Sequence, residues 1–396
     1  MATPEVEFNP YDPAFNADPY PTYHRLRAED PVHRTPMGFW ILTRYDDVAT
    51  VLRDARFGRK GFDELIRDRF GENSFDQAML FRDPPDHTRL RALVNKAFTP
   101  RVIEEMRAKI QKTVDRLLDG VRDARAMDVI TDLAYPLPVS VISEMLGVPA
   151  EDRDLFRGWS ADITRSLDAI TLPTEPEVVE RGNAARHALS SYFRALIAGR
   201  RRRPQRDLLS DLIAAEEQGD KLSEEELMAT ILLLFVAGHE TTVNLIGNGT
   251  LALLRNPDQL EALRRSPALI GGAIEELLRY DAPVQRTGRM PNTDAELGGK
   301  RIAKGDLVLS LIGAANRDPA HFAEPDRLDL ARADNRHLAF GWGIHFCLGA
   351  PLARAEAQAA IGTIARRMPA LALATPTPDW REASALRGLK TLPVTF

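Results

Sequence analysis

The sequence predicts a mainly α-helical protein with small β-sheets. Helical periodicity dominates the chain, and its longest apolar pattern runs from Ser223 to Leu254. Only two stretches, residues 32–44 and 284–312, have β-prone residues around glycine or proline turns. With 44% hydrophobic residues among 396, the chain can bury a substantial core. No linker, repeat or low-complexity tract divides it, so we expect one domain over residues 1–396.

The first elements alternate between helix and hairpin. A helix is expected over residues 21–29, a hairpin with a Pro-Met-Gly turn over residues 32–44, and a second helix over residues 45–54. Residues 56–82 lose periodicity but keep five phenylalanines, so a long irregular loop, often a functional feature, is expected there. Further helices are expected at roughly 86–98, 101–119, 138–146, 150–168, 176–201 and 207–217.

The longest helix has a clear start and a buried middle. Ser223 and Glu226 have the spacing of a capping box. Residues 231–237 are almost wholly apolar, so this helix is expected to be buried. The later elements are a helix over residues 268–280, which stops before Pro283, a hairpin over residues 298–312 and a last helix over residues 350–368.

Charge and composition exclude several classes of protein. The net charge of -5 gives no general attraction to nucleic acid, and the basic run at residues 200–203 is expected to be a solvated helix end. A single cysteine excludes an intrachain disulfide, which fits a reducing compartment. No segment reaches the ~18 apolar residues of a membrane span, and the polar N-terminus lacks the features of a secretory signal. We therefore expect a soluble cytoplasmic protein that binds neither nucleic acid nor membranes.

Residues 237–242, Ala-Gly-His-Glu-Thr-Thr, interrupt the apolar run of the longest helix. Gly238 costs about 1 kcal/mol relative to alanine inside a helix, and Glu240 is costly in a buried setting unless it has a partner. A buried acid beside Thr241 could hold water and relay protons. Alternatively, one helix ends at Gly238 and Thr241 caps a new one. The stretch alone leaves both interpretations open.

Glu276 and Arg279 are three residues apart and share one face of a predicted helix. Taken alone, this spacing is typical of a solvated surface pair, which contributes only a few tenths of a kcal/mol. Its interpretation therefore depends on what lies around it.

The only cysteine, Cys347, lies among Gly341, Gly343 and Gly349, just before the last predicted helix. A lone cysteine is most often a small buried hydrophobe. However, a helix N-terminus lowers the pKa of a thiol, and glycines let a flat group approach the backbone. A thiolate held in this way suits iron ligation in a haem protein.

Residues 340–349, Phe-Gly-x-Gly-x-His-x-Cys-x-Gly, resemble the haem-binding signature of the cytochrome P-450 family. Residues 237–242 resemble the family's oxygen-activation motif, and Glu276 with Arg279 resembles its Glu–Arg pair, with Arg327 as the expected third member. The motifs stand in the family's order, and the resemblance covers essentially the whole chain. It implies the cytochrome P-450 fold, with a long central helix over the haem, in a single haem domain of the soluble bacterial type without a fused reductase.

The resemblance also implies a role for each matched residue. Cys347 would be the axial thiolate ligand of the iron in haem b (iron protoporphyrin IX). Glu240 and Thr241 would deliver protons during oxygen activation, while Glu276, Arg279 and Arg327 would form a structural network beneath the haem. The haem propionates would be held by four residues that, taken singly, could also be solvated or packing side chains: His87, Arg91, Arg289 and His345.

As a function, the resemblance implies a haem-thiolate monooxygenase. This oxidoreductase would insert one atom of O2 into a small apolar or amphipathic substrate, by hydroxylation or epoxidation. Electrons would come from NAD(P)H through a separate ferredoxin reductase and ferredoxin. The alternatives are haem-thiolate chemistry with peroxide or nitric oxide, and a non-enzymatic haem carrier or gas sensor. Glu240 with Thr241, and the lack of an appended output domain, favour the monooxygenase.

Two surfaces follow from this resemblance. The substrate cavity is expected to draw on residues 56–82, 155–185, 233–237 and 284–287 and on the turn near Leu386. The cations of the first segment, Arg59, Lys60, Arg67 and Arg69, could bind a carboxylate of the substrate, but a solvated loop is the favoured expectation. An acidic ferredoxin is expected to dock on the thiolate side, at a basic patch formed by Arg89, Arg91, Lys96, Arg101, Arg107, Lys109 and Arg354.

Overall fold

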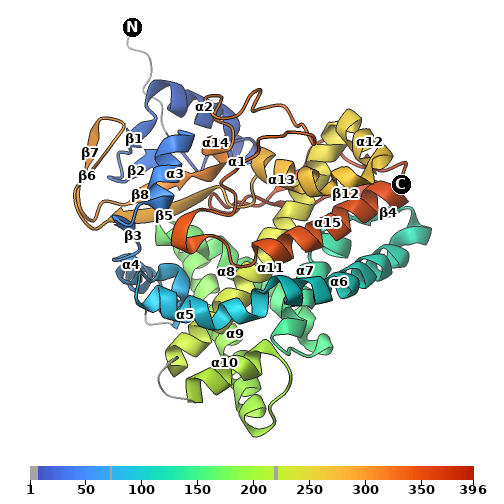
Figure 1. The fold of residues 1–396 in the computed structure, drawn as a ribbon, viewed down its shortest axis with the longest axis horizontal. Helices are drawn as coiled ribbons and strands as arrows, with labels where there is room; N and C mark the ends of the chain where they lie inside the picture. The colour runs from blue at the N-terminus through green and yellow to red at the C-terminus, as the bar shows by residue number, and fades with distance from the viewer. Residues whose placement is uncertain (1–7, 72–73, 218–221) are drawn as a thin grey trace.

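One long helix, α11 (Glu224–Arg255), runs through the middle of the molecule, and helices from both halves of the chain pack against it (Figure 1). The computed structural model describes residues 8–71, 74–217 and 222–396. Residues 1–7 of the N-terminus and residues 72–73 of the predicted loop lie outside this part. Within it, helices dominate and the strands form four small sheets, which confirms the predicted fold class.

The predicted helices occur in the predicted order, with several different ends, and the structure adds four short helices that were not predicted, over residues 13–17, 62–70, 257–265 and 312–315. Before α11 they are α1 (Pro13–Ala17), α2 (Tyr20–Glu29), α3 (Tyr45–Arg53), α4 (Phe62–Phe70), α5 (Asp86–Asn95), α6 (Pro100–Val121), α7 (Pro136–Met145), α8 (Phe156–Ser166), α9 (Pro176–Arg202) and α10 (Leu208–Glu217). After it come α12 (Pro257–Arg265), α13 (Ile270–Tyr280), α14 (Ile312–Ala315) and α15 (Ala350–Arg367).

Helix α11 begins with the predicted capping box. The Ser223 hydroxyl accepts a hydrogen bond from the Glu226 N–H (3.2 Å), and the Glu226 carboxylate accepts one from the Ser223 N–H (2.9 Å). By length and hydropathy α11 alone among the described helices could cross a membrane, whereas the sequence analysis expected no such segment. However, 83% of its most apolar window is buried inside the fold. It is therefore the central core helix.

The largest sheet has the strand order β1-β2-β8-β5-β3 and lies to one side of the helices (Figure 1). β2 pairs with β8 in parallel, and the other neighbours are antiparallel. Its strands are β1 (Val32–Arg34), β2 (Trp40–Leu42), β3 (Phe57–Gly58), β5 (Arg286–Pro291) and β8 (Val308–Leu311). The smaller sheets join β4 (Ala126–Asp128), β12 (Pro393–Thr395) and β9 (Ala372–Leu373); β6 (Ala295–Leu297) and β7 (Lys300–Ile302); and β10 (Asp379–Trp380) and β11 (Leu389–Thr391).

The structure confirms the first predicted hairpin and corrects the second. β1 and β2 pair antiparallel, with Val32 opposite Leu42. The predicted hairpin over residues 298–312 is wrong, because β7 turns back onto β6 through Gly298 and Gly299. Both glycines have positive φ (55° and 76°), as a tight hairpin turn requires. β8 pairs instead with β2 and β5, and a local pattern cannot reveal these partners.

The segment expected as an irregular loop, residues 56–82, contains strand β3 and helix α4. Phe62, Ile66 and Phe70 recur every four residues and are all buried, so they form one apolar helix face. The four-residue spacing was present in the sequence. The flanking glycines and charged residues hid it, since α4 has only nine residues.

Two other helices have different bounds from those predicted. The helix expected at 138–146 is α7, which starts at Pro136 after a π-helical turn over Ile130–Ala134. Proline is well tolerated in the first turn, so Pro136 and Pro138 do not delay the start of the helix. The helix expected at 150–168 is α8, flanked by short 3-10 segments at Ala150–Leu155 and Leu167–Ile170.

Candidate active site

The loop before α15 holds Cys347 in a tight turn. Gly341 and Gly343 both have a φ of 71°, which favours glycine. A Cβ atom on Gly343 would lie 2.6 Å from the Leu52 carbonyl oxygen of α3, so a side chain there would push the loop away from that helix. The Cys347 N–H donates to the Phe340 carbonyl (2.9 Å). The turn therefore places the half-buried Cys347 at the N-terminus of α15.

The electrostatic setting of Cys347 differs in part from the expectation. Burial raises the pKa of the Cys347 thiol above its ordinary value. The backbone N–H groups of Gly349 and Ala350 and the charges of Arg91 and Arg354 lower it, but they offset only part of this rise. The helix terminus thus acts in the predicted direction without lowering the pKa overall. A metal ion deprotonates the thiol that coordinates it outright, so this site still suits a thiolate ligand.

The structure brings the four predicted propionate residues together near this loop. The rings of His87, on α5, and His345 lie 4.3 Å apart between centroids. Arg91, one turn along α5, donates to the carbonyls of Ile344 (3.0 Å) and Phe346 (2.7 Å). Arg289, on β5, is 3% exposed, and its charge acts on both histidines.

Arg59 is a fifth member of this group, and its predicted solvation is wrong. It is 5% exposed, donates to the Thr287 hydroxyl (3.1 Å), and lies 5.0 Å from the centre of the Phe62 ring. Its charge and that of Arg289 act on each other and on His345. We call the set of Arg59, His87, Arg91, Arg289 and His345 the cation cluster.

The cation cluster carries more positive charge than the surrounding residues neutralise. Among the described residues, the carboxylate that acts on Arg59 and Arg289 is that of Asp83, which already accepts the backbone N–H groups of Arg59 and Lys60. Burial and the neighbouring arginines lower the pKa of His345 to about 2, so this ring is neutral.

Orphaned donors in the cation cluster indicate which group it can hold. His345 Nε2 and Arg59 Nε are buried without a hydrogen-bond partner. The Arg59 and Arg289 guanidinium groups share the charge of one carboxylate, that of Asp83, while Arg91 donates only to backbone carbonyls, so a pair of further carboxylates would neutralise the cation cluster. Haem carries such a pair in its propionates, so the residues present fit this cofactor.

The long helix is continuous through residues 237–242, so it does not end at Gly238. The Thr241 hydroxyl donates to the Ala237 carbonyl one turn earlier (3.1 Å), a bond that competes with the helix ladder. From residues 227 to 253 of α11, only Ala237, Gly238 and Thr241 are not buried. These three form one accessible face in the middle of a buried helix.

Glu240 points elsewhere on the same helix and has a strong partner. It is 2% exposed, and its carboxylate lies 2.6 Å from Nη1 of Arg381, in the C-terminal segment. Its other oxygen lies 3.7 Å from Nε2 of His239. Sequence reasoning missed Arg381, because a partner 141 residues away has no local signal.

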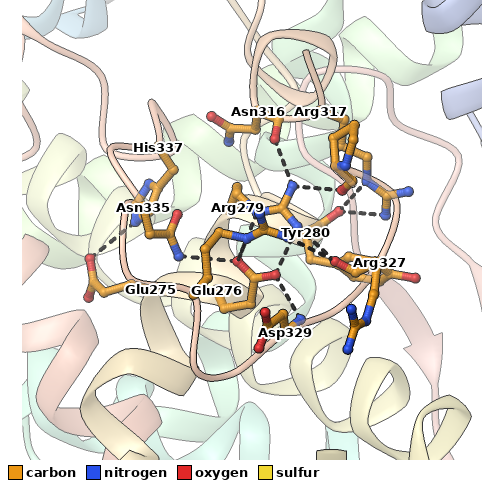
Figure 2. Close-up of polar contacts among 12 residues, drawn as sticks. Glu275, Glu276, Arg279, Tyr280, Asn316, Arg317, Arg327, Asp329, Asn335 and His337 are labelled. Carbon is orange, nitrogen blue, oxygen red and sulfur yellow. Dashed lines mark hydrogen bonds and ion pairs between the residues drawn. The ribbon is translucent and has the colours of Figure 1, made fainter. Parts of the chain in front are cut away.

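Glu276 is the centre of a fully buried polar network (Figure 2). Its two carboxylate oxygens each accept a hydrogen bond from Arg279 at 2.8 Å, and neither side chain is exposed. The Asp329 N–H (2.9 Å) and the Asn335 side chain (3.2 Å) donate to the same carboxylate. The pair predicted at residues 276 and 279 is therefore a core network rather than a surface ion pair.

The third member of this network is Arg332, not the predicted Arg327. Arg332 Nε lies 3.1 Å from the Glu276 carboxylate and is itself largely buried. The Arg327 side chain is 60% exposed and pairs with Glu324. Arg327 contributes only its carbonyl oxygen, which accepts from Arg279 (3.2 Å). The sequence could not distinguish the two arginines because both lie in the same irregular stretch.

The neighbouring Glu275 links this network to the cysteine loop. Its carboxylate lies 3.1 Å from His337 and 2.7 Å from Arg354, which flank the loop on either side. Burial raises the pKa of Glu275, but the hydrogen bonds from Arg354 and His337 outweigh it and lower the pKa to about 2. Helix α13 thus fixes both ends of the loop that carries Cys347.

A cysteine at a helix N-terminus, buried cations beside it and a long helix with an acid–alcohol pair together suit a protein that binds haem through a thiolate. The comparisons agree. The family model for cytochrome P450 matches residues 32–266 and 268–371. The chain is 43% identical to a biotin biosynthesis cytochrome P450 from Bacillus subtilis, over 96% of this chain and 97% of that protein. It is also 43% identical to a vitamin D(3) 25-hydroxylase from Pseudonocardia autotrophica, over 96% and 94% of the two chains.

A solved structure of similar fold is that of myxobacterial cytochrome P450 CYP267B1 in complex with myristic acid. It has a TM-score of 0.91 and 45% identity, with 98% of each chain covered. The chain belongs to the cytochrome P450 family. It is an oxidoreductase whose cofactor is haem, a monooxygenase that acts on organic substrates with electrons from separate redox proteins.

Proposed function

We propose that Cys347 is the thiolate ligand of the haem iron and that the cation cluster holds the haem propionates. The observation that carries this proposal is the cation cluster itself: guanidinium groups that form no ion pair within the described part of the chain, next to the only cysteine of the sequence. Haem bound here supplies oxygen activation, which a thiolate ligand favours. Glu276, Arg279 and Arg332 hold the irregular segment that precedes the cysteine loop.

The substrate in this proposal is an apolar or amphipathic molecule. The accessible face of α11 at Ala237 and Gly238 offers it no charge, and Val284 and Leu386, which form a β-bridge, add apolar surface. CYP267B1 was solved in complex with myristic acid, and P450BioI in complex with a hexadec-9Z-enoic acid ligated acyl carrier protein. These relatives support long apolar chains as ligands here.

We further propose that Thr241 and Glu240 handle protons for this reaction. Thr241 lies on the accessible face of α11 and can exchange its bond to Ala237 for one to a bound molecule or water. Glu240 is buried, but its partner Arg381 is 23% exposed, so the pair connects the interior to solvent. General acid–base groups placed in this way contribute roughly 10²–10⁴-fold to a rate.

Replacing Thr241 with alanine is expected to separate electron use from product formation. The variant should keep haem and substrate binding, but product formed per NADH should fall roughly tenfold or more, since proton delivery is lost. The lost electrons should appear as hydrogen peroxide. Thr250→Ala is the matched control, because Thr250 makes the same bond to the carbonyl one turn earlier (2.7 Å) on the same helix. If Thr241→Ala, Thr250→Ala and the parent protein form the same amount of product per NADH, the proposed role of Thr241 is wrong.

The electron donor in this proposal is an acidic ferredoxin that docks over the cysteine loop, in the cytoplasm. The predicted basic patch is largely neutralised, because Arg89 pairs with Glu226, Arg101 with Glu105 and Arg107 with Glu104. Lys109 pairs with Glu144 and Arg354 with Glu275. Of the predicted patch, Lys96 is exposed and forms no ion pair within the described part of the chain, and the cysteine loop exposes two apolar side chains, Ile344 (52%) and Phe346 (41%).

Reversing one charge should therefore slow reduction without affecting substrate. Lys96→Glu is expected to lower the rate of reduction by an acidic ferredoxin several-fold at low salt, because complementary charge mainly raises association rates. The difference in rate between the variant and the parent should shrink as the ionic strength rises to about 0.15 M, where the Debye length is about 8 Å. Arg203→Glu, at the C-terminal end of α9, serves as an exposed control. Stopped-flow reduction that is equally fast in all three proteins would place the donor on another face.

A further inference from the structure

A second buried arginine lies outside the cation cluster, where three helices meet. Arg186, on α9, is 5% exposed. Its guanidinium carbon lies 4.0 Å from the centre of the Phe70 ring at the end of α4, and its Nη1 reaches Ser166 at the end of α8. The helices α4, α8 and α9 all belong to the predicted substrate side of the molecule.

The partners of Arg186 are all neutral. Nη1 donates to the Ser166 hydroxyl (2.8 Å) and Nη2 to the Asn183 side-chain oxygen (2.8 Å). Nε is buried without a hydrogen-bond partner. Burial lowers the pKa of Arg186 to about 10, and no carboxylate of the described residues counteracts it. The side chain is a buried cation with an unused donor.

The nearest acids along these helices are engaged by other arginines. Asp162 lies 2.8 Å from Arg181. Asp168 lies 2.6 Å from Arg286 and also accepts the N–H groups of Ser384 and Ala385. An uncompensated buried charge is strongly unfavourable, so an anion from outside the chain would stabilise Arg186.

Helix α4 connects Arg186 to the haem side of the molecule. Its buried face begins at Phe62, which contacts Arg59 of the cation cluster, and ends at Phe70, which contacts Arg186. At 1.5 Å per residue, the two phenylalanines lie roughly 12 Å apart along the helix. An apolar chain of this length would span the distance from a charged end at Arg186 to the Arg59 side of the cation cluster.

Resting on the function proposed above, we propose that Arg186 binds the carboxylate of an amphipathic acid, so that the substrates of this enzyme are organic acids with a long apolar chain. The guanidinium Nε–H is the free donor, and Ser166 and Asn183 hold the group in place. A charge-assisted hydrogen bond to a carboxylate would supply the missing anion. The apolar chain would then run in the direction of α4 toward the cation cluster.

A purely structural role for Arg186 makes a different prediction. Helices α8 and α9 approach closely, since a Cβ atom on Gly182 would lie 2.4 Å from the Ser166 side chain. In a purely structural role, Arg186 would only hold these two helices together. Such a role would affect every ligand equally, whereas a carboxylate site would distinguish an acid from its alcohol. The two roles can therefore be separated by ligand chemistry.

The experiment titrates the haem-loaded enzyme with dodecanoic acid and with dodecanol at neutral pH, following the substrate-induced spin shift. The parent protein should bind the acid more tightly than the alcohol. Arg186→Gln should weaken binding of the acid roughly ten- to hundredfold, the range of a charged hydrogen bond, and leave the affinity for the alcohol unchanged. Arg186→Lys should restore part of the preference. Arg181→Gln, which removes an exposed arginine of the same helix, should behave as the parent.

Three results would overturn the proposal: no preference for the acid in the parent protein, equal weakening of both ligands in Arg186→Gln, or the same acid affinity in Arg186→Gln as in the parent. If Arg186→Gln does not fold, the parent comparison and Arg186→Lys still decide. Failure of the proposed monooxygenase function can be distinguished from failure of the Arg186 proposal. In the first case no ligand, dodecanol included, would give product when NADH and redox proteins are supplied.

Discussion

Replacing Glu276 with alanine is expected to leave little soluble, haem-containing protein. The substitution strands Arg279 and Arg332 without the carboxylate that they share, and both are buried. It also removes the acceptor of the Asp329 N–H and the Asn335 amide. Removing one partner of a buried ion pair costs on the order of 3–5 kcal/mol. Since a typical domain is stable by only about 5–15 kcal/mol, this loss is a large fraction of the total.

The measurement is the yield of soluble holoprotein together with its thermal midpoint. Arg327→Ala is the matched control, because it removes an arginine of the same region whose side chain is exposed and pairs only with Glu324. Such surface pairs contribute about 0–1 kcal/mol, so this variant should behave as the parent. Arg332→Ala should resemble Glu276→Ala instead. A haem-replete Glu276→Ala with an unchanged midpoint would show that the network does not support the fold.

Replacing Cys347 with serine is expected to abolish NADH-dependent product formation while the chain remains folded. Cys347 is half-buried, and the turn around it depends on backbone hydrogen bonds and glycines rather than on the thiol. The thermal midpoint of the protein without haem should therefore change little. The electron-donating thiolate would be lost, and with it the oxygen chemistry that it favours.

The control for this variant is Ile344→Ala, which changes an exposed side chain of the same loop without touching the site of ligation. It should keep substrate turnover when reduction is driven chemically rather than by ferredoxin. Product formation by Cys347→Ser at a rate near that of the parent would exclude Cys347 as the essential ligand.

Features carried by local spacing could be predicted from the sequence. The capping box at Ser223 and the buried course of α11 follow from residue types a few positions apart. The turn around Cys347 follows from its glycines, and the pairing of Glu276 with Arg279 from their three-residue spacing. The resemblance then linked these motifs, since each one alone had an ordinary structural explanation.

Features that depend on distant contacts could not be predicted. Arg59 is buried because α4 and β5 close over it, and nothing near residue 59 indicates that packing. Arg381 pairs with Glu240, which is 141 residues earlier in the chain. β8 pairs with β2 although Trp40 and its partner Val308 are 268 residues apart. Arg332 replaces Arg327 because the irregular backbone between α14 and the cysteine loop turns one side chain inward and the other outward.

The proposed function depends most on ligation of the haem iron by the Cys347 thiolate. The most direct measurement is the absorption spectrum of the reduced, carbon monoxide-bound protein. We expect the Soret band at the long wavelength that distinguishes thiolate-ligated haem from histidine-ligated haem, and we expect Cys347→Ser to lose it. A parent protein whose band lies at the shorter wavelength of histidine ligation, in a fully folded and haem-replete sample, would contradict the account.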